Sequence, residues 1–194
     1  MIRFSIIIPT LGRPSLEALL ISIETQPLGA GQVIVMGESP DGNLVRRVNY
    51  FGPRFRCYFC PSGRPGGYGN PQRNFALPLC HGDYINYQDD DDVMTPGILA
   101  VMRANCEAQP GKIFIYQMRW PDGHLNPGYP PRDLAGGQCF VWPNIPGRMG
   151  KFGHRYAGDQ DFMEQTIALH PDGKAGVIYR PEVITEYAGC HEKK

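Results

Sequence analysis

The chain has 194 residues, of which 42% are hydrophobic and 20% are charged, and its 19 basic and 19 acidic residues cancel to zero net charge. This composition excludes intrinsic disorder, which requires low hydrophobicity and high net charge, and it leaves no bulk field that favours nucleic acid or an anionic membrane. The length suits one domain with its own core, so we expect a single domain over residues 1–194.

The first half of the chain alternates short apolar runs with helical patterns. Strands are expected at the runs rich in β-branched and aromatic residues, 4–8, 32–36, 55–59 and 83–88. Helices are expected between them, at 14–23, 41–50 and 70–79. This alternation predicts an α/β fold with a Rossmann-like, mostly parallel sheet flanked by helices.

The second half is less regular. We expect a helix from Pro96, strands at 112–118 and 139–142, a helix at 159–169, and two short strands at 175–179 and 182–186. Glycine and proline gather at 61–71 and 121–150, which predicts shaped loops of the kind in which functional sites are found.

An acidic run, Asp89-Asp90-Asp91-Asp92, follows the fourth expected strand directly. Four adjacent carboxylates repel one another, so they are protonated, solvated or bound to a cation. At the carboxyl end of a parallel strand they would lie where α/β sheets bind ligands, and carboxylate oxygens suit Mg²⁺ or Mn²⁺. The alternative is a solvated acidic turn that caps the helix beginning near Pro96.

Four segments in chain order resemble the family 2 glycosyltransferases of the GT-A fold. Residues 5–14 (SIIIPTLGRP) resemble the opening strand of that family, and residues 68–74 (YGNPQRN) resemble its glycine-to-Arg-Asn element. Residues 82–96 (GDYINYQDDDDVMTP) are similar to the strand that carries the Asp-X-Asp motif, and residues 158–162 (GDQDF) to the late acidic element. The resemblance implies one GT-A-like domain.

That resemblance implies an inverting, metal-dependent transfer of a sugar from a nucleotide-diphosphate sugar, a UDP-sugar in the first place, to an acceptor hydroxyl. In this family the nucleotide-binding half would be residues 1–92 and the acceptor half residues 93–194. The cation, Mn²⁺ or Mg²⁺, would lie on Asp91 and Asp92, with His191 either a third ligand or part of a frayed polar tail. Asp89 would face the sugar or ribose. Asp90 would join the donor site or, at the variable position of the motif, simply be solvated.

The same resemblance implies a general base at Asp159, with Asp161 as the second candidate. A single carboxylate base on the face opposite the leaving group implies inversion at the anomeric carbon. Asp159 could also cap the helix that begins there.

The nucleotide would lie over the carboxyl ends of the first strands, flanked by Pro9, Thr10 and Arg13. Members of the family place acidic residues after the second strand, where this chain has Glu38. Arg73 would pair with a phosphate through its bidentate fork, unless it is an ordinary helix-surface arginine.

The acceptor stays open: a glycan, a lipid-linked sugar, a protein or a modified nucleic-acid base. Residues 136–143 (GGQCFVWP) are expected on the acceptor side, with Trp120 and Trp142 either as stacking surfaces for a sugar or as core aromatics. Two other functions remain, a sugar nucleotidyltransferase and a non-catalytic module that binds a sugar nucleotide or a glycan. For the first of these, residues 11–14 (LGRP) make a poor phosphate loop.

The apolar run at 4–8 is far too short to span a bilayer, and no basic leader precedes it, so we expect a cytoplasmic protein without a membrane span. Its six cysteines should then be mostly reduced. Cys57 and Cys60 have the spacing of metal ligands, but on a strand they point to opposite faces, which favours buried free thiols over zinc.

Overall fold

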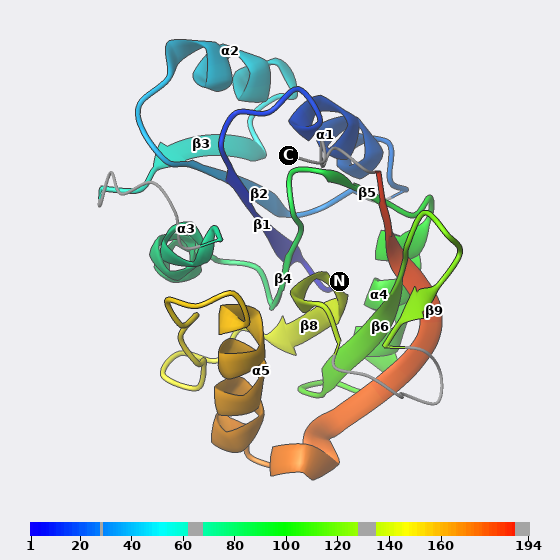
Figure 1. Cartoon of the computed structure of the whole chain (residues 1–194). Coiled ribbons are helices and arrows are strands. Elements are labelled where there is room, and N and C mark those ends of the chain that lie inside the picture. Colours follow the sequence, from blue (N-terminus) through cyan, green and yellow to red (C-terminus); the bar gives the residue numbers. More distant parts are fainter. Residues whose placement is uncertain (28, 62–67, 128–134, 189–194) are drawn as a thin grey trace.

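The computed structural model describes residues 1–27, 29–61, 68–127 and 135–188. At its centre lies one sheet with the strand order β3-β2-β1-β4-β8-β6-β9-β5, and β7 pairs with β6 at the side (Figure 1). The strands are β1 Phe4–Thr10, β2 Gln32–Gly37, β3 Phe55–Phe59, β4 Tyr84–Tyr87, β5 Asp92–Met94, β6 Ile113–Arg119, β7 Leu125–Asn126, β8 Phe140–Pro143 and β9 Val177–Tyr187. The helices are α1 Leu16–Glu24, α2 Gly42–Tyr50, α3 Asn70–Ala76, α4 Ile98–Ala108 and α5 Gly158–Leu169, with 3-10 turns η1 Leu77–Leu79, η2 Gly137–Cys139 and η3 Gly173–Gly176.

The predicted α/β class and the parallel first half are confirmed. β1 is parallel to both β2 and β4, and β2 is parallel to β3. Beyond β4 the sheet is mixed, because β8 runs antiparallel to both β4 and β6. The carboxyl ends of β1, β2 and β4 therefore meet at one edge of the sheet.

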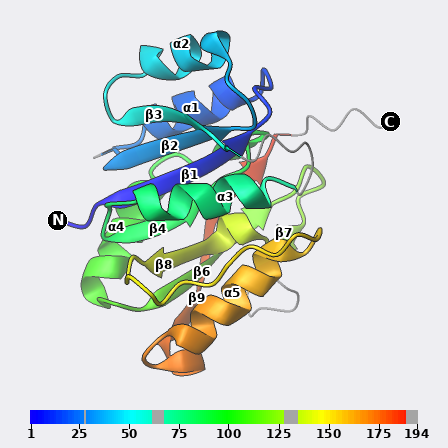
Figure 2. The ribbon, with the colours of Figure 1, turned by 90° about the vertical axis from the view of Figure 1, so that its left-hand side faces the viewer.

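Helices cover both faces of the sheet (Figure 2). Every residue of β1 is buried, and its side chains alternate between two cores. Phe4, Ile6 and Ile8 pack with side chains of α1, α2 and α4, whereas Ile7 packs with those of α3 and α5. The acidic run follows β4, a strand buried on both faces, so the sheet holds the run in a fixed place.

One prediction about the second half is wrong, and two strands of the sheet were not predicted. β5 and β7 have three and two residues, which is too short for a recognisable strand pattern. The two short strands expected at 175–179 and 182–186 form the single strand β9, which continues through Pro181. Proline cannot donate a ladder hydrogen bond, and the pairing of β9 with β6 shifts register here, between Ile115 and Gln117. Gln117 Nε2 donates to Pro181 O at 2.7 Å and stabilises the irregularity.

None of the helices in the described ranges is long and apolar enough to cross a membrane. Cys57, Cys80, Cys106 and Cys139 are free thiols.

Candidate active site

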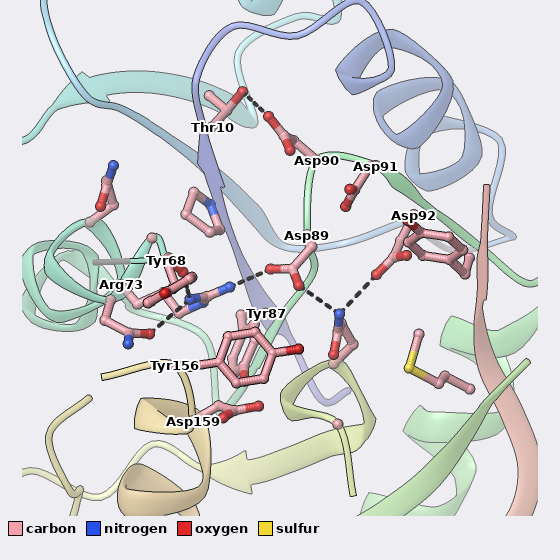
Figure 3. Close-up of a pocket in the computed structure, with 18 of the residues that line it drawn as sticks. Thr10, Tyr68, Arg73, Tyr87, Asp89, Asp90, Asp91, Asp92, Tyr156 and Asp159 are labelled. Atoms are coloured by element: carbon pink, nitrogen blue, oxygen red, sulfur yellow. Dashed lines mark hydrogen bonds and ion pairs between the residues drawn. The ribbon is translucent and has the colours of Figure 1, made fainter. Parts of the chain in front are cut away.

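One cavity of about 660 Å³ opens at the edge where β1, β2 and β4 end (Figure 3). It brings together most of the site residues expected from the sequence: Pro9, Thr10, Arg13, Glu38, Arg73, Asp89, Asp90, Asp91, Asp92 and Asp159. Asp161 is not among the lining residues, and His191 lies outside the described residues. Segments from both ends of the chain thus form one concave surface.

The acidic run is not a solvated turn. Asp90, Asp91 and Asp92 are all buried, and the residue that caps α4 is Gly97, so the helix-capping alternative is wrong. The possibility that Asp90 is solvated is wrong for the same reason. Its Oδ2 accepts from Thr10 Oγ1 at 2.6 Å and from Leu11 N at 3.3 Å. Burial raises the pKa of Asp90, and the hydrogen bond from Thr10 opposes that shift.

Two arginines hold the loop that follows β1. Arg13 Nη1 lies 3.2 Å from Asp90 Oδ1 and 3.3 Å from Asp91 Oδ2, so its guanidinium bridges both carboxylates. Arg47 of α2 donates to the carbonyl oxygens of Gly12 and Arg13, each at 2.9 Å. The loop therefore holds the positively charged guanidinium of Arg13 against Asp90 and Asp91.

The carboxylate of Asp92 has few hydrogen-bond donors around it. Its Oδ2 accepts from Gln138 Nε2 at 3.0 Å, while its buried Oδ1 has no hydrogen-bond partner. Burial, followed by the charges of Asp89 and Asp91, raises the pKa of Asp92 to about 8. A buried acceptor without a donor is costly, and a cation at this place would satisfy it. In the described part of the chain, however, no three His, Cys, Asp or Glu side chains already form a metal-binding group.

Arg73 is buried, which contradicts the helix-surface alternative. Its guanidinium forms an ion pair with Asp89 and donates to Tyr68 O at 2.7 Å and to Asn70 Oδ1 at 3.0 Å. It also lies over the ring of Tyr87, with the guanidinium carbon 4.5 Å from the ring centre. Arg73 therefore fixes the first carboxylate of the run.

The two candidate bases have different surroundings. Asp159 lies in the first turn of α5 and lines the cavity. Its Oδ2 accepts from Gly137 N at 3.2 Å, and its Oδ1 from Gln160 N at 2.9 Å. The residue at the N-cap position is Ala157, so the alternative that Asp159 caps the helix is wrong.

Asp161 faces the protein surface instead. Arg155 binds both of its carboxylate oxygens, with the Nε to Oδ2 distance at 2.9 Å. The hydrogen bond from Arg155 lowers the pKa of Asp161, which makes this carboxylate a weaker base.

On the acceptor side, the two tryptophans differ. Trp142 is fully buried and packs against Phe140 and Phe162, with ring centres 5.2 and 4.9 Å away, so it is a core aromatic. Trp120 is 40% exposed and lines the cavity beside Tyr187.

The cavity residues that had no individual role in the sequence analysis include Tyr68, Gln138 and Tyr156. Gln138 donates to Asp89 Oδ2 at 2.6 Å as well as to Asp92. Tyr68 and Gln138 stand in segments that were singled out, 68–74 and 136–143, whereas nothing in the local sequence marks Tyr156.

The family model described as glycosyl transferase family 2 matches residues 5–170. A comparison with curated protein sequences gives no match. Among solved structures, S. aureus TarS superposes with a TM-score of 0.76 at 15% identity, over 96% of this chain and 37% of that chain. A mannosyltransferase from Pyrobaculum calidifontis, in complex with GDP-Man and Mn²⁺, gives 0.68 at 15% identity, over 99% of this chain and 58% of that one.

Glucosyl-3-phosphoglycerate synthase from Mycobacterium tuberculosis, in complex with Mn²⁺, UDP and glucosyl-3-phosphoglycerate, gives a TM-score of 0.67 at 14% identity, over 97% of this chain and 72% of that chain. At these identities the similarity establishes the fold. The chain spans 37% to 60% of the length of the TarS structures that it matches.

Proposed function

The chain belongs to glycosyl transferase family 2, and from that premise we propose that it transfers a sugar from a nucleotide diphosphate to an acceptor hydroxyl, with a divalent cation and with inversion. The observation that carries this proposal is the cavity in which the buried run Asp89 to Asp92 and the carboxylate of Asp159 face one space. One group of carboxylates suits a metal-bound diphosphate, and the separate carboxylate suits proton transfer.

Asp91 and Asp92 are the residues that would hold the cation, and the unpartnered Oδ1 of Asp92 is what makes them fit. When bound, Mn²⁺ or Mg²⁺ neutralises the charge that develops on the departing nucleotide diphosphate. His191 keeps its role as a further proposed ligand. Two carboxylates would leave room on the cation for oxygens of the donor diphosphate.

The nucleotide would lie along Pro9, Thr10 and Arg13, with its base or ribose at Glu38. Oε1 of Glu38 is buried without a hydrogen-bond partner, and a nucleotide N–H or ribose hydroxyl would satisfy it. A UDP-sugar is the proposed donor. Arg73 forms an ion pair with Asp89, so its role at the donor site is to position that carboxylate rather than to contact a phosphate directly. Asp90 likewise serves the donor site by fixing the loop after β1.

Asp159 is the proposed base. Among the described residues, the donors to its oxygens are the backbone N–H groups of Gly137 and Gln160, whereas both oxygens of Asp161 are bound by Arg155. The acceptor hydroxyl gives its proton to Asp159 as its oxygen forms a bond to the anomeric carbon. The bond from that carbon to the diphosphate oxygen breaks on the opposite face, and the nucleotide diphosphate leaves with the electron pair. One displacement of this kind inverts the anomeric configuration.

The test measures nucleotide binding and donor cleavage with purified protein. UDP and GDP with Mn²⁺ should raise the melting temperature, because a ligand that binds only the folded state stabilises it. UDP-sugars should be hydrolysed slowly, with release of nucleotide diphosphate. Asp91→Ala should abolish hydrolysis and the part of the melting-temperature rise that depends on Mn²⁺. Asp122→Ala, a substitution at an exposed loop residue, should change neither.

Three results would count against the proposal. Full hydrolysis in EDTA or by Asp91→Ala would show that the reaction does not need a divalent cation at this site. Release of pyrophosphate from a nucleoside triphosphate and a sugar phosphate would point to a nucleotidyltransferase. Tight nucleotide-sugar binding without any cleavage or transfer would indicate a binding module.

A further inference from the structure

Two tyrosines at the cavity are far more exposed than aromatic side chains usually are. Tyr68 is 63% exposed and Tyr156 is 82% exposed, and both line the cavity. Their rings meet edge to face, with centres 5.3 Å apart and planes at 85°. Figure 3 shows the pair on the side of Arg73 and Asp159, away from Asp90 and Asp91. Neither ring covers the hydrophobic core, so stability does not explain their placement.

The backbone at Tyr68 is strained in a way that favours a functional role. Its φ is 57°, and among the described residues it is the non-glycine residue with positive φ. This left-handed conformation is unfavourable for an L-residue with a side chain. Arg73 donates to Tyr68 O at 2.7 Å and so helps to hold this conformation. Strain held by surrounding structure is typical of functional sites.

The segment that carries Tyr156 is held by hydrogen bonds that connect to Arg73 as well. Asn70 Nδ2 donates to Gly153 O at 2.7 Å and to Arg155 O at 3.0 Å, which fixes the segment that leads into Tyr156. Oδ1 of Asn70 accepts from Arg73 at 3.0 Å. One hydrogen-bonded network therefore positions both tyrosines and, through Arg73, the carboxylate of Asp89.

The charges around the pair restrict the ligand that it can take. Asp89 is paired with Arg73, and Asp161 with Arg155. Asp159 shares the field of these two arginines, so the described groups around the rings are three carboxylates against two guanidinium groups, an excess of one negative charge. An anionic acceptor is disfavoured there. Because the rings are perpendicular, a flat base could not be sandwiched between them and would have to stack on one ring alone.

We propose that Tyr68 and Tyr156 form the acceptor platform and that the acceptor is an uncharged carbohydrate. The apolar C–H face of a pyranose packs on the tyrosine faces, its edge hydroxyls remain free for hydrogen bonds, and one hydroxyl points to Asp159. This inference rests on the proposed function, because it assumes that Asp159 receives the proton of the acceptor.

The test uses methyl β-glucoside and methyl α-mannoside as ring probes, sorbitol as an open-chain polyol and uridine as a flat-base probe. Binding is followed by saturation-transfer NMR on the protein with UDP and Mn²⁺. Three variants are compared with wild type: Tyr68→Ala/Tyr156→Ala, Tyr68→Phe/Tyr156→Phe, and the control Tyr50→Ala. Tyr50 is 88% exposed and also sits edge to face on a neighbouring ring, Phe51, but it does not line the cavity.

At least one methyl glycoside should bind wild type with saturation concentrated on one ring face, and sorbitol should bind at least about tenfold more weakly. The double alanine variant should lose about tenfold in glycoside affinity, while the double phenylalanine variant and Tyr50→Ala should stay within about threefold of wild type. UDP affinity should change by less than about twofold in all three variants.

Several outcomes overturn the platform. They are glycoside binding unaffected by the double alanine variant, loss of uridine or UDP binding in its place, or no glycoside binding by a protein that does bind UDP and hydrolyse a donor. Failure of wild type to bind any nucleotide diphosphate is a different result, because it overturns the proposed function itself.

Discussion

Asp159→Asn isolates the proposed base, because it keeps the shape of the side chain and removes its ability to take a proton. Asn keeps one carbonyl oxygen, so one of the two backbone donors, Gly137 N or Gln160 N, loses its partner. A lost hydrogen bond of this kind costs about 1 kcal/mol of folding free energy. A domain of this size is stable by about 5–15 kcal/mol, so the variant should remain folded.

The expected effect on catalysis is larger. General base catalysis contributes about a hundredfold or more to the rate, which corresponds to about 2.7 kcal/mol in the activation barrier. Unfolding alone could lower activity by that factor only if almost the whole population were unfolded, which a loss of about 1 kcal/mol cannot cause. We therefore expect transfer to fall about a hundredfold or more, while Mn²⁺ and nucleotide affinities stay nearly unchanged.

The assay pairs this variant with Asp161→Asn, two residues further along the same helix. Both are measured for the rate of transfer at saturating donor, for UDP affinity by calorimetry and for urea unfolding. Asp161→Asn should retain transfer within about threefold, because an exposed ion pair with Arg155 contributes little. Normal transfer in Asp159→Asn with loss in Asp161→Asn would move the base by two residues. Normal transfer in both would refute the single-base inverting mechanism.

Three further predictions follow from buried groups of the cavity. Glu38→Ala should weaken nucleotide binding by about 1–3 kcal/mol, because an N–H or hydroxyl donor of the nucleotide would lose its buried acceptor. Calorimetry with UDP measures this, and an unchanged Kd would show that Glu38 does not bind the nucleotide. Gly137→Ala should lower the free energy of unfolding by about 1–3 kcal/mol, since an added Cβ would overlap the buried hydroxyl of Tyr87; urea unfolding checks this against Gly42→Ala, where the nearest side-chain atom would be 3.9 Å from the Cβ. The raised pKa of Asp92, about 8, means that the folded protein holds this proton more tightly than the unfolded chain. The protonated carboxyl therefore stabilises the fold below about pH 4, and this contribution is lost as the pH rises to about 8. Without metal, Asp92→Asn should become more stable relative to wild type as the pH rises across that window. A difference in the free energy of urea unfolding that does not change with pH would contradict the reasoning.

The sequence by itself determined the α/β class, the course of the first half and the location of the acidic run. These depend on local patterns: β-branched runs bounded by glycine and proline, helical spacing in residues 14–23, and Asp89 to Asp92 directly after a strand buried on both faces. Since the carboxyl ends of parallel strands meet at one edge, the position of the acidic run in the sequence already placed it at the site.

Only the tertiary structure decided which groups compensate one another. Arg73 could be assigned to a phosphate or to the surface until the fold brought its guanidinium to Asp89. Asp159 and Asp161 are equivalent carboxylates in sequence, and they differ because Arg155 binds only the second. Partners of this kind are chosen by packing between elements far apart in the chain, and local periodicity carries no record of that packing. The contact of Tyr68 with Tyr156 could not be predicted for the same reason, because one residue precedes α3 and the other precedes α5, and only the fold brings these segments together.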